Sequence, residues 1–415
     1  MPIVYIHGVN VREPFDWSGI RVFLRRYVAP KLNPAAPDDV AIDAVFWGDH
    51  AARFAWNMQS LPGNSVAIAM GKAPDPSADE TWRLVSLAAG SDAANPKAAR
   101  AVAAPAALRA GPRVTFGVVL TREQIVDVLI AATFPQSRRA DAPADVQADE
   151  EWAKQAAAID DVVGERVVDS AELTPEFVAE ILRSVQERTE QPRAQGENFF
   201  ARAQARVEDA LGSFGDRGAL AAARMSMPVR RNANTFVSRF CGDVFSYLRS
   251  RDDGADAGCV PRRLMDKLIE VRARSPQDEP MVLLSHSMGG QISYDVLSYY
   301  AERYEGWGTM QVDVWAAAAS QVGYFEELKL HRLACADWGA SPKTKAPKPQ
   351  RVKLWWNVWD PADFASYTAA RVFDGVTDQA FGSGLSPVDA HGGYLIAPRF
   401  YRLLAAKVAE SRTIA

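Results

Sequence analysis

The sequence contains few of the residues that build metal sites and disulfide scaffolds. Its 415 residues include three cysteines and five histidines. Cys241, Cys259 and Cys335 form no CxxC pair, and the histidines form no HExxH motif. An odd number of isolated cysteines is typical of reduced thiols, so we expect neither a disulfide framework nor a zinc site. The chain also lacks a glycine-rich phosphate loop, and we therefore expect no metal and no organic cofactor.

An excess of basic charge and long apolar runs are absent as well. The formal net charge is −4, whereas nucleic-acid-binding domains usually carry a basic excess, so we expect no nucleic-acid partner. No predominantly apolar run reaches the roughly 20 residues that a membrane-spanning helix needs. The opening "MPIVYIHGVN" has no basic segment followed by an apolar one, so no signal peptide is visible. We expect a cytoplasmic protein.

What is present is the composition of a globular protein with a large core. Hydrophobic residues make up 48 % of the chain and charged residues 24 %. Five short apolar runs predict strands: 2–8, 40–48, 280–286, 311–320 and 351–359. Helical patterns separate them, at 16–30, 235–251, 261–275, 289–304 and 392–410. Apolar strands alternating with helices indicate an α/β fold, with a mostly parallel sheet flanked by helices.

Residues 49–234 do not share this alternation. They contain no convincing strand and several amphipathic helical patterns. One of them begins at Thr174, a good N-cap residue, with Pro175 at the first helical position. We predict a core formed by residues 1–48 and 235–415, with a mainly helical insertion over 49–234.

The stretch "MVLLSHSMGG" (281–290) runs from an apolar strand into a serine and two glycines. A serine on a sharp strand-to-helix turn, with small residues two before and two after, is the G-x-S-x-G nucleophile elbow. Ser285 occupies the first glycine position here and Gly289 the second. The pattern predicts Ser287 as a nucleophile, and an ordinary strand-to-helix turn is the alternative.

A nucleophilic serine needs a base and an acid. His391 is the last histidine, follows the final predicted strand and is flanked by Ala390 and Gly392. We predict it as the base, although a solvated loop histidine is the alternative. Asp360 and Asp363 follow the strand 351–359, where the orienting acid belongs. We prefer Asp363 as the acid and keep Asp360, which precedes a proline, as the alternative or as a turn former.

The tetrahedral intermediate needs backbone donors. One is the N–H of Met288, directly after the nucleophile, and the other is the N–H of Val9, in the "HGVN" loop after the first strand. The neighbouring residues that we predict to contact substrate are His7, Gly8, Asn10, His286 and Trp47. For His7 and Trp47, packing and loop shaping are the alternative.

These pieces, in this order on the ends of these elements, resemble the α/β-hydrolase superfamily, in particular its lipase- and esterase-like bacterial members. The resemblance covers 1–48 and about 235–412, and "HSMGG" resembles an elbow variant of that group. The chain departs from the pattern at Ser285 and lacks the early strands of the full sheet, which implies a core trimmed at its N-terminal edge. In this fold an insertion acts as a lid. The stretches 113–120 and 124–134 would then line an acyl pocket or form the core of a helical subdomain.

The resemblance implies a serine hydrolase that cleaves carboxylic esters, with hydrophobic acyl esters or lipids as substrates, through a Ser-His-Asp acyl-enzyme mechanism. An acyltransferase or thioesterase would use the same residues. Two other readings stay open: a non-catalytic, hydrolase-like binding module, and an intracellular phospholipase effector gated by its insertion. The expected partner is a small-molecule or lipid ester, and the insertion leaves peripheral membrane contact open. The sequence does not determine the oligomeric state.

Overall fold

The structure, a computed structural model, describes most of the core and part of the predicted insertion. The described residues are 2–13, 15–55, 58, 116–133, 146–189, 227–275, 279–304, 306–341, 343–385 and 390–413. Of the predicted insertion, residues 56–57, 59–115, 134–145 and 190–226 lie outside them.

The centre of the protein is a six-stranded sheet in which every neighbouring pair is parallel. In spatial order its strands are β12 (Val376–Ala380), β10 (Val352–Trp359), β8 (Val312–Ala318), β7 (Val282–His286), β1 (Pro2–Ile6) and β2 (Ala41–Val45). The five strands predicted from apolar runs are confirmed. The edge strand β12 was not predicted, because its sequence, VTDQA, is half exposed and has no apolar run. The α/β class is therefore confirmed.

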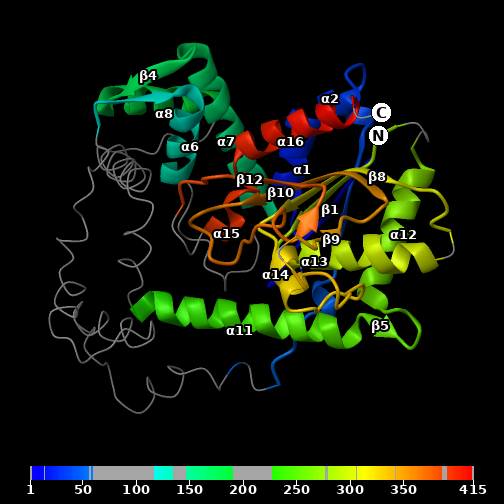
Figure 1. The fold of residues 1–415 in the computed structure, drawn as a ribbon. Coiled ribbons are helices and arrows are strands. Elements are labelled where there is room, and N and C mark those ends of the chain that lie inside the picture. Colours follow the sequence, from blue (N-terminus) through cyan, green and yellow to red (C-terminus); the bar gives the residue numbers. More distant parts are fainter. Residues whose placement is uncertain are drawn as a thin grey trace.

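Helices cover both faces of this sheet (Figure 1). Alternate residues of β1 enter two separate apolar clusters: Ile3 and Tyr5 one, Val4 and Ile6 the other. The first cluster includes residues of α1 (Ser18–Phe23), α2 (Ala29–Leu32) and α16 (Pro398–Ser411). The second includes residues of α11 (Met227–Ser250), α12 (Cys259–Ala273) and α13 (Met288–Asp295). Strands buried on both faces explain the continuous apolar runs in the sequence.

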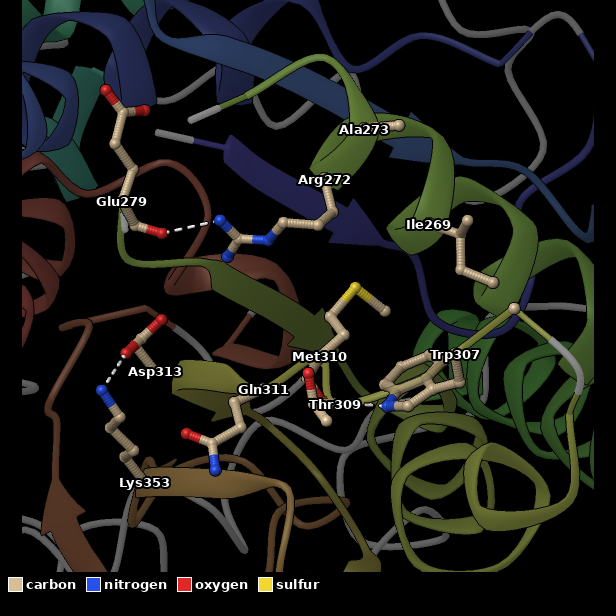
Figure 2. A pocket seen from close by; sticks show the side chains of 11 residues that line it. Ile269, Arg272, Ala273, Glu279, Trp307, Thr309, Met310, Gln311, Asp313 and Lys353 are labelled. Carbon is tan, nitrogen blue, oxygen red and sulfur yellow. Dashed lines mark hydrogen bonds and ion pairs between the residues drawn. The ribbon is translucent and has the colours of Figure 1, made fainter. Parts of the chain in front are cut away.

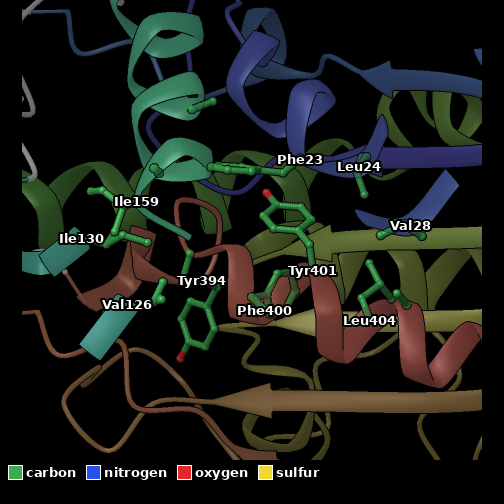
Figure 3. Packing of buried hydrophobic residues seen from close by; sticks show 14 of the residues in the cluster. Phe23, Leu24, Val28, Val126, Ile130, Ile159, Tyr394, Phe400, Tyr401 and Leu404 are labelled. Atoms are coloured by element: carbon green, nitrogen blue, oxygen red, sulfur yellow. The ribbon is translucent and has the colours of Figure 1, made fainter. Parts of the chain in front are cut away.

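Aromatic packing fixes the helices on the first face. Phe23 of α1 stacks on Tyr401 of α16, with ring centroids 5.0 Å apart (Figure 3). Pro398 is the first residue of α16, where its missing N–H has no intrahelical partner to lose. It therefore starts this helix and does not kink it.

Between residues 116 and 189 the described part of the insertion forms three helices and a two-stranded sheet, and its predicted end at 234 falls inside α11, which already begins at Met227. The helices are α6 (Arg122–Thr133), α7 (Val146–Arg166) and α8 (Pro175–Arg188). The strands β3 (Val118–Thr121) and β4 (Ser170–Leu173) pair antiparallel, so the expectation of no strand in this region is wrong here. Each strand has four residues, of which only one is buried. Such strands are too short to show a clear alternation of apolar and polar residues in the sequence. The predicted start of α8 is confirmed, since Thr174 Oγ1 accepts a hydrogen bond from the Phe177 N–H at 3.1 Å.

The insertion helices α6 and α7 pack on the core helices α1 and α16, and α8 packs on α7 (Figures 1 and 3). Tyr27 and Arg402 of the core both donate to Asp160 of α7, and Arg399 of α16 pairs with Asp127 of α6 at 2.5 Å. Apolar residues of α6, such as Ile125, are buried in the same cluster as Phe23 and Tyr401. The stretch 124–133 therefore forms part of a packed core. Residues 113–115 and 134, for which an acyl-pocket lining was also predicted, lie outside the described residues.

The remaining elements are short. They are the hairpin β5 (Asp252–Asp253) and β6 (Asp256–Ala257), the pair β9 (Ala346–Pro347) and β11 (Phe373–Asp374), the helices α14 (Val322–Glu327) and α15 (Ala390–Gly393), π-helical turns at Leu24–Val28 and Val296–Tyr300, and 3₁₀ turns at Pro37–Asp39, Gly48–His50 and Ala301–Arg303. Among the helices that the structure describes, none combines the length and the apolar character needed to cross a membrane.

Candidate active site

The turn between β7 and α13 has the backbone conformation of a nucleophile elbow. Ser287 lies between the last residue of β7 and the first of α13, with φ 52° and ψ −126°. A serine with positive φ is strained, and such strain persists only where the surrounding structure enforces it. Gly289 is required beside it, since a Cβ there would lie 2.7 Å from the carbonyl oxygen of Ile6. The close approach of α13 to β1 therefore fixes the turn.

Ser285 has a structural reason to replace the first glycine of the elbow. Its side chain is fully buried, and its Oγ accepts a hydrogen bond from the Trp315 indole N–H at 2.9 Å. Trp315 lies on the neighbouring strand β8, opposite Leu283. The serine thus satisfies a buried indole that glycine would leave without this partner.

Ser287, His391 and Asp363 form one chain of hydrogen bonds. His391 Nε2 lies 2.8 Å from Ser287 Oγ, and His391 Nδ1 lies 3.0 Å from Asp363 Oδ2 and 3.1 Å from Oδ1. The carboxylate requires a proton on Nδ1, which leaves Nε2 free to accept the serine hydroxyl hydrogen. Ser287 is fully buried, whereas the His391 side chain is 12 % exposed and that of Asp363 2 %. In this arrangement an oriented imidazole is within hydrogen-bond distance of a serine hydroxyl whose proton it could accept.

The structure separates the two candidate acids. Asp363 is the carboxylate on His391. Asp360 accepts the backbone N–H of Ser383 at 2.7 Å and that of Ala362 at 2.8 Å. Burial raises the pKa of Asp360, while these hydrogen bonds oppose the shift. Asp360 therefore holds the chain after β12 in place.

The loop that follows β1 lies against Ser287. A Cβ on Gly8 would be 2.5 Å from Ser287 Cβ, so only glycine allows this approach. The Gly8 carbonyl accepts a hydrogen bond from the His7 Nδ1–H at 2.7 Å. The Val9 N–H belongs to the same planar peptide and points the opposite way, away from the His7 ring. Within the described part of the chain, neither the Val9 N–H nor the Met288 N–H has a hydrogen-bond acceptor, so both are available as oxyanion donors.

His7 and Trp47 support this loop from behind. His7 Nε2 accepts the Trp47 backbone N–H at 3.0 Å, and the Trp47 indole donates to the His7 carbonyl at 2.8 Å. The rings stack with centroids 5.2 Å apart, and both side chains are buried. Burial lowers the pKa of His7 to about 3, so the imidazole is neutral with its proton on Nδ1. We assign both residues a positioning role, in line with the packing alternative.

Asn10 and Asp243 fix the far end of the same loop. Asn10 has φ 64°, donates its N–H to Asp243 Oδ2 at 2.9 Å and accepts from Arg239 through its side chain at 2.7 Å. The fully buried Asp243 carboxylate also pairs with Arg12 at 2.8 Å. Sequence reasoning missed Asp243. Its signal was an acidic residue directly before the buried Val244 of α11.

His286 supports His391. Its Nε2–H donates to the carbonyl oxygen of His391 at 2.7 Å, and the two rings lie 5.0 Å apart. Burial, reinforced by the neighbouring His391, lowers the pKa of His286 to about 3. A neutral imidazole with its proton on Nε2 thus anchors the backbone that carries the base. Substrate contact by His286 and Asn10 stays a prediction.

A second polar network holds the acid loop that carries Asp363. The Asn357 side-chain amide donates to the Tyr367 carbonyl at 2.9 Å, and the Tyr367 N–H donates to the Ser320 carbonyl at 3.0 Å. The Gln321 amide donates to the carbonyl of Ala365. The segment after β8, strand β10 and the acid loop are thereby joined, which fixes Asp363 relative to the sheet.

A cavity of about 610 Å³ lies at the opposite edge of the sheet, where β7, β8 and β10 begin (Figure 2). Two basic residues, Arg272 and Lys353, and two acidic residues, Glu279 and Asp313, line it. The Lys353 ammonium pairs with Asp313 at 2.7 Å, and Arg272 donates to the Glu279 carbonyl at 2.7 Å. The cavity and the triad thus lie at opposite edges of the sheet, and among the described residues that line the cavity there is no serine, cysteine or histidine.

Within the described ranges, no group of three or more His, Cys, Asp or Glu residues is arranged to hold a metal ion. Cys241, Cys259 and Cys335 are free thiols. A scan against protein-family models and searches of curated proteins and solved structures found no match to this chain. The geometry of the site is therefore the basis for inferring a function.

Proposed function

We propose that this protein is a serine hydrolase that cleaves carboxylic esters through an acyl-enzyme intermediate. The observation that carries the proposal is the 2.8 Å contact between His391 Nε2 and Ser287 Oγ on a strained turn. Structural turns do not need an imidazole on their serine, nor a carboxylate behind that imidazole. Both are present here.

Each residue has a role in this mechanism. Ser287 Oγ attacks the ester carbonyl while His391 Nε2 accepts its proton, and the Asp363 carboxylate stabilises the imidazolium that forms. The N–H groups of Val9 and Met288 donate to the oxyanion. His391 then returns the proton to the leaving alcohol. It next activates the water that attacks the acyl-enzyme, which releases the acid and regenerates Ser287.

The positions of these residues favour an α/β-hydrolase type of core. The nucleophile follows β7, the acid follows β10 and the histidine follows β12, so all three are at the carboxyl edge of a parallel sheet. That is also the chain order Ser, Asp, His of this fold. With six strands, the sheet is trimmed relative to the full one.

The surroundings of Asp363 favour a hydrophobic ester. Phe364, the next residue, is 63 % exposed. Tyr367 of the same loop stacks on Tyr324 of α14, with ring centroids 4.9 Å apart, and both are partly exposed. An apolar acyl or alcohol group would gain contact area on these rings.

The test measures hydrolysis of p-nitrophenyl esters of increasing acyl length by the wild type and by Ser287→Ala. We expect a burst of p-nitrophenol, turnover that rises with acyl length, and loss of both in the variant. Ser285→Gly is the matched control, because it removes a neighbouring serine hydroxyl and restores the glycine form of the elbow; it should remain active. Equal turnover by the wild type and Ser287→Ala would refute the proposal. If the wild type is folded but stays inactive, even with phospholipid vesicles, the result would favour the alternative hypothesis of a non-catalytic binding module.

A further inference from the structure

A fourth side chain contacts the proposed triad. The Tyr394 hydroxyl donates to Asp363 Oδ2 at 3.3 Å, the same oxygen that faces His391 Nδ1 at 3.0 Å. We infer that Tyr394 is a positioning residue that sets how strongly Asp363 attracts the proton on His391. The inference rests on the proposed function, since it concerns the same triad.

Local geometry explains how one turn reaches the carboxylate twice. His391 belongs to α15, and Tyr394 is the first residue after this helix, three positions beyond His391. Side chains three apart on a helical turn share a face. Gly393 lets this turn approach Ser383, because a Cβ there would lie 2.5 Å from Ser383 Cβ.

The tyrosine ring is rigidly held, so its hydroxyl has a defined direction. Tyr394 is fully buried, stacks on Phe381 at 5.6 Å and meets Phe400 edge-on at 6.3 Å. Figure 3 shows the ring at the border of the apolar cluster with its hydroxyl pointing away from Phe400. Burial, with the Asp363 charge next in size, raises the pKa of Tyr394 far above its ordinary value. The phenol is therefore a neutral donor at every working pH.

A neutral donor on a carboxylate stabilises its negative charge and weakens it as a base. If the hydroxyl is removed, Asp363 attracts the Nδ1 proton of His391 more strongly. The protonated imidazolium form of His391 is then stabilised relative to the neutral imidazole. The titration of His391 should therefore move to higher pH. A residue that only fills space would not produce this shift.

The experiment follows the imidazole signals of His391 by NMR as the pH is changed, in the wild type and in Tyr394→Phe, with His391→Gln used for assignment. We expect the midpoint to rise by about half a pH unit in Tyr394→Phe. Tyr247→Phe is the matched control: its buried hydroxyl donates to Asp295 at 2.9 Å, a carboxylate beside another histidine. It should leave the His391 midpoint unchanged.

An unchanged midpoint in Tyr394→Phe, or an equal shift in Tyr247→Phe, would overturn the inference. Should Tyr394→Phe fail to fold, 3-fluorotyrosine at position 394 keeps the packing and donates more strongly, so the midpoint should move to lower pH. An unmoved or raised midpoint in that protein would likewise overturn it. The NMR titration needs no substrate. If the protein had no esterase activity, the proposed function would be refuted, but the titration would still test the role of Tyr394.

Discussion

His391 and His331 both lie beside an aspartate, but their surroundings differ in a way that bears on the proposed reaction. Both imidazoles present Nδ1 to an aspartate, at 3.0 Å for His391 and 3.5 Å for His331 with Asp295. The difference lies at Nε2. In His391 this atom faces Ser287 Oγ, whereas in His331 it donates to the carbonyl of Val322 at 3.0 Å. An imidazole whose second nitrogen already donates to the backbone cannot act as a base there.

The two carboxylates differ as well. Asp295 is fully buried, which by itself raises its pKa, but His331, Arg251 and the Arg332 N–H outweigh burial and hold the pKa of Asp295 below its usual range. Arg251 pairs with it at 3.0 Å and Tyr247 donates at 2.9 Å. This cluster joins α11, α13 and the chain after α14. The contacts of the His331 pair are those of a structural ion pair, whereas those of the His391 pair fit the proton transfer that we propose for it.

The largest expected effect comes from removing the charge of each aspartate in turn. Asp363→Asn removes the carboxylate that fixes the His391 tautomer, and we expect a loss of about 10⁴-fold in kcat/KM with little loss of stability. Asp295→Asn leaves the Arg251 charge without its buried partner, and we expect a loss of about 3–5 kcal/mol in the free energy of unfolding. Ester hydrolysis and urea unfolding, measured on both variants, check the two halves.

The comparison would be broken if the two variants exchanged phenotypes. A catalytic loss in folded Asp295→Asn as large as that in Asp363→Asn would mean that the second pair also serves the reaction. Asp360→Asn, measured beside them, should lose far less activity than Asp363→Asn, because its contacts are to the backbone of Ala362 and Ser383.

The next effect concerns the loop that the His331 site lacks. Gly8→Ala places a methyl group 2.5 Å from Ser287 Cβ, so loop and nucleophile must move apart and the Val9 N–H leaves its position. We expect kcat to fall about 100-fold. Gly392→Ala, next to His391 but with open space where the Cβ would be, is the control and should keep its activity. Equal kcat values for the two variants would remove the proposed oxyanion role of this loop.

The smallest effect is on the pH dependence of stability. The pKa of His286 is lowered from 6.5 to about 3 in the folded protein by burial, so the unfolded chain binds a proton that the folded one does not. The resulting stability is present above pH 6.5 and is lost as the pH falls from 6.5 towards 3. Asp295, whose pKa is lowered from 3.8, contributes stability that is lost only below that pH. The His391 site should therefore weaken at a higher pH than the His331 site.

His286→Gln isolates this contribution, because glutamine does not titrate and still offers an N–H to the His391 carbonyl. Between about pH 6.5 and about pH 5, the wild type should lose about 2 kcal/mol more of its unfolding free energy than the variant does. Urea unfolding at a series of pH values measures the difference. Parallel curves for the two proteins would show that His286 is not the buried neutral group described above.

The sequence revealed the elements whose signals are local. Apolar runs marked five of the six strands of the sheet, and the order Ser287, Asp363, His391 matches the order of strand ends along the chain. The edge strand β12 escaped notice because its sequence, VTDQA, contains no apolar run, whereas the run 40–48 marked the other edge strand, β2. Asp243 and Tyr394 also escaped, since what they contact is decided by the approach of distant segments, which spacing does not show. For the same reason the sequence left Asp360 and Asp363 unresolved, and the structure placed only one of them on His391.

The most direct test of the central claim is the site of covalent labelling by a fluorophosphonate, located by peptide mass spectrometry. Only a serine activated by a neighbouring base reacts readily with such a probe. We predict label on Ser287 in the wild type and in His331→Asn, and no label in His391→Ala or Ser287→Ala. Label on another serine, or label on Ser287 that persists in His391→Ala, would contradict the account.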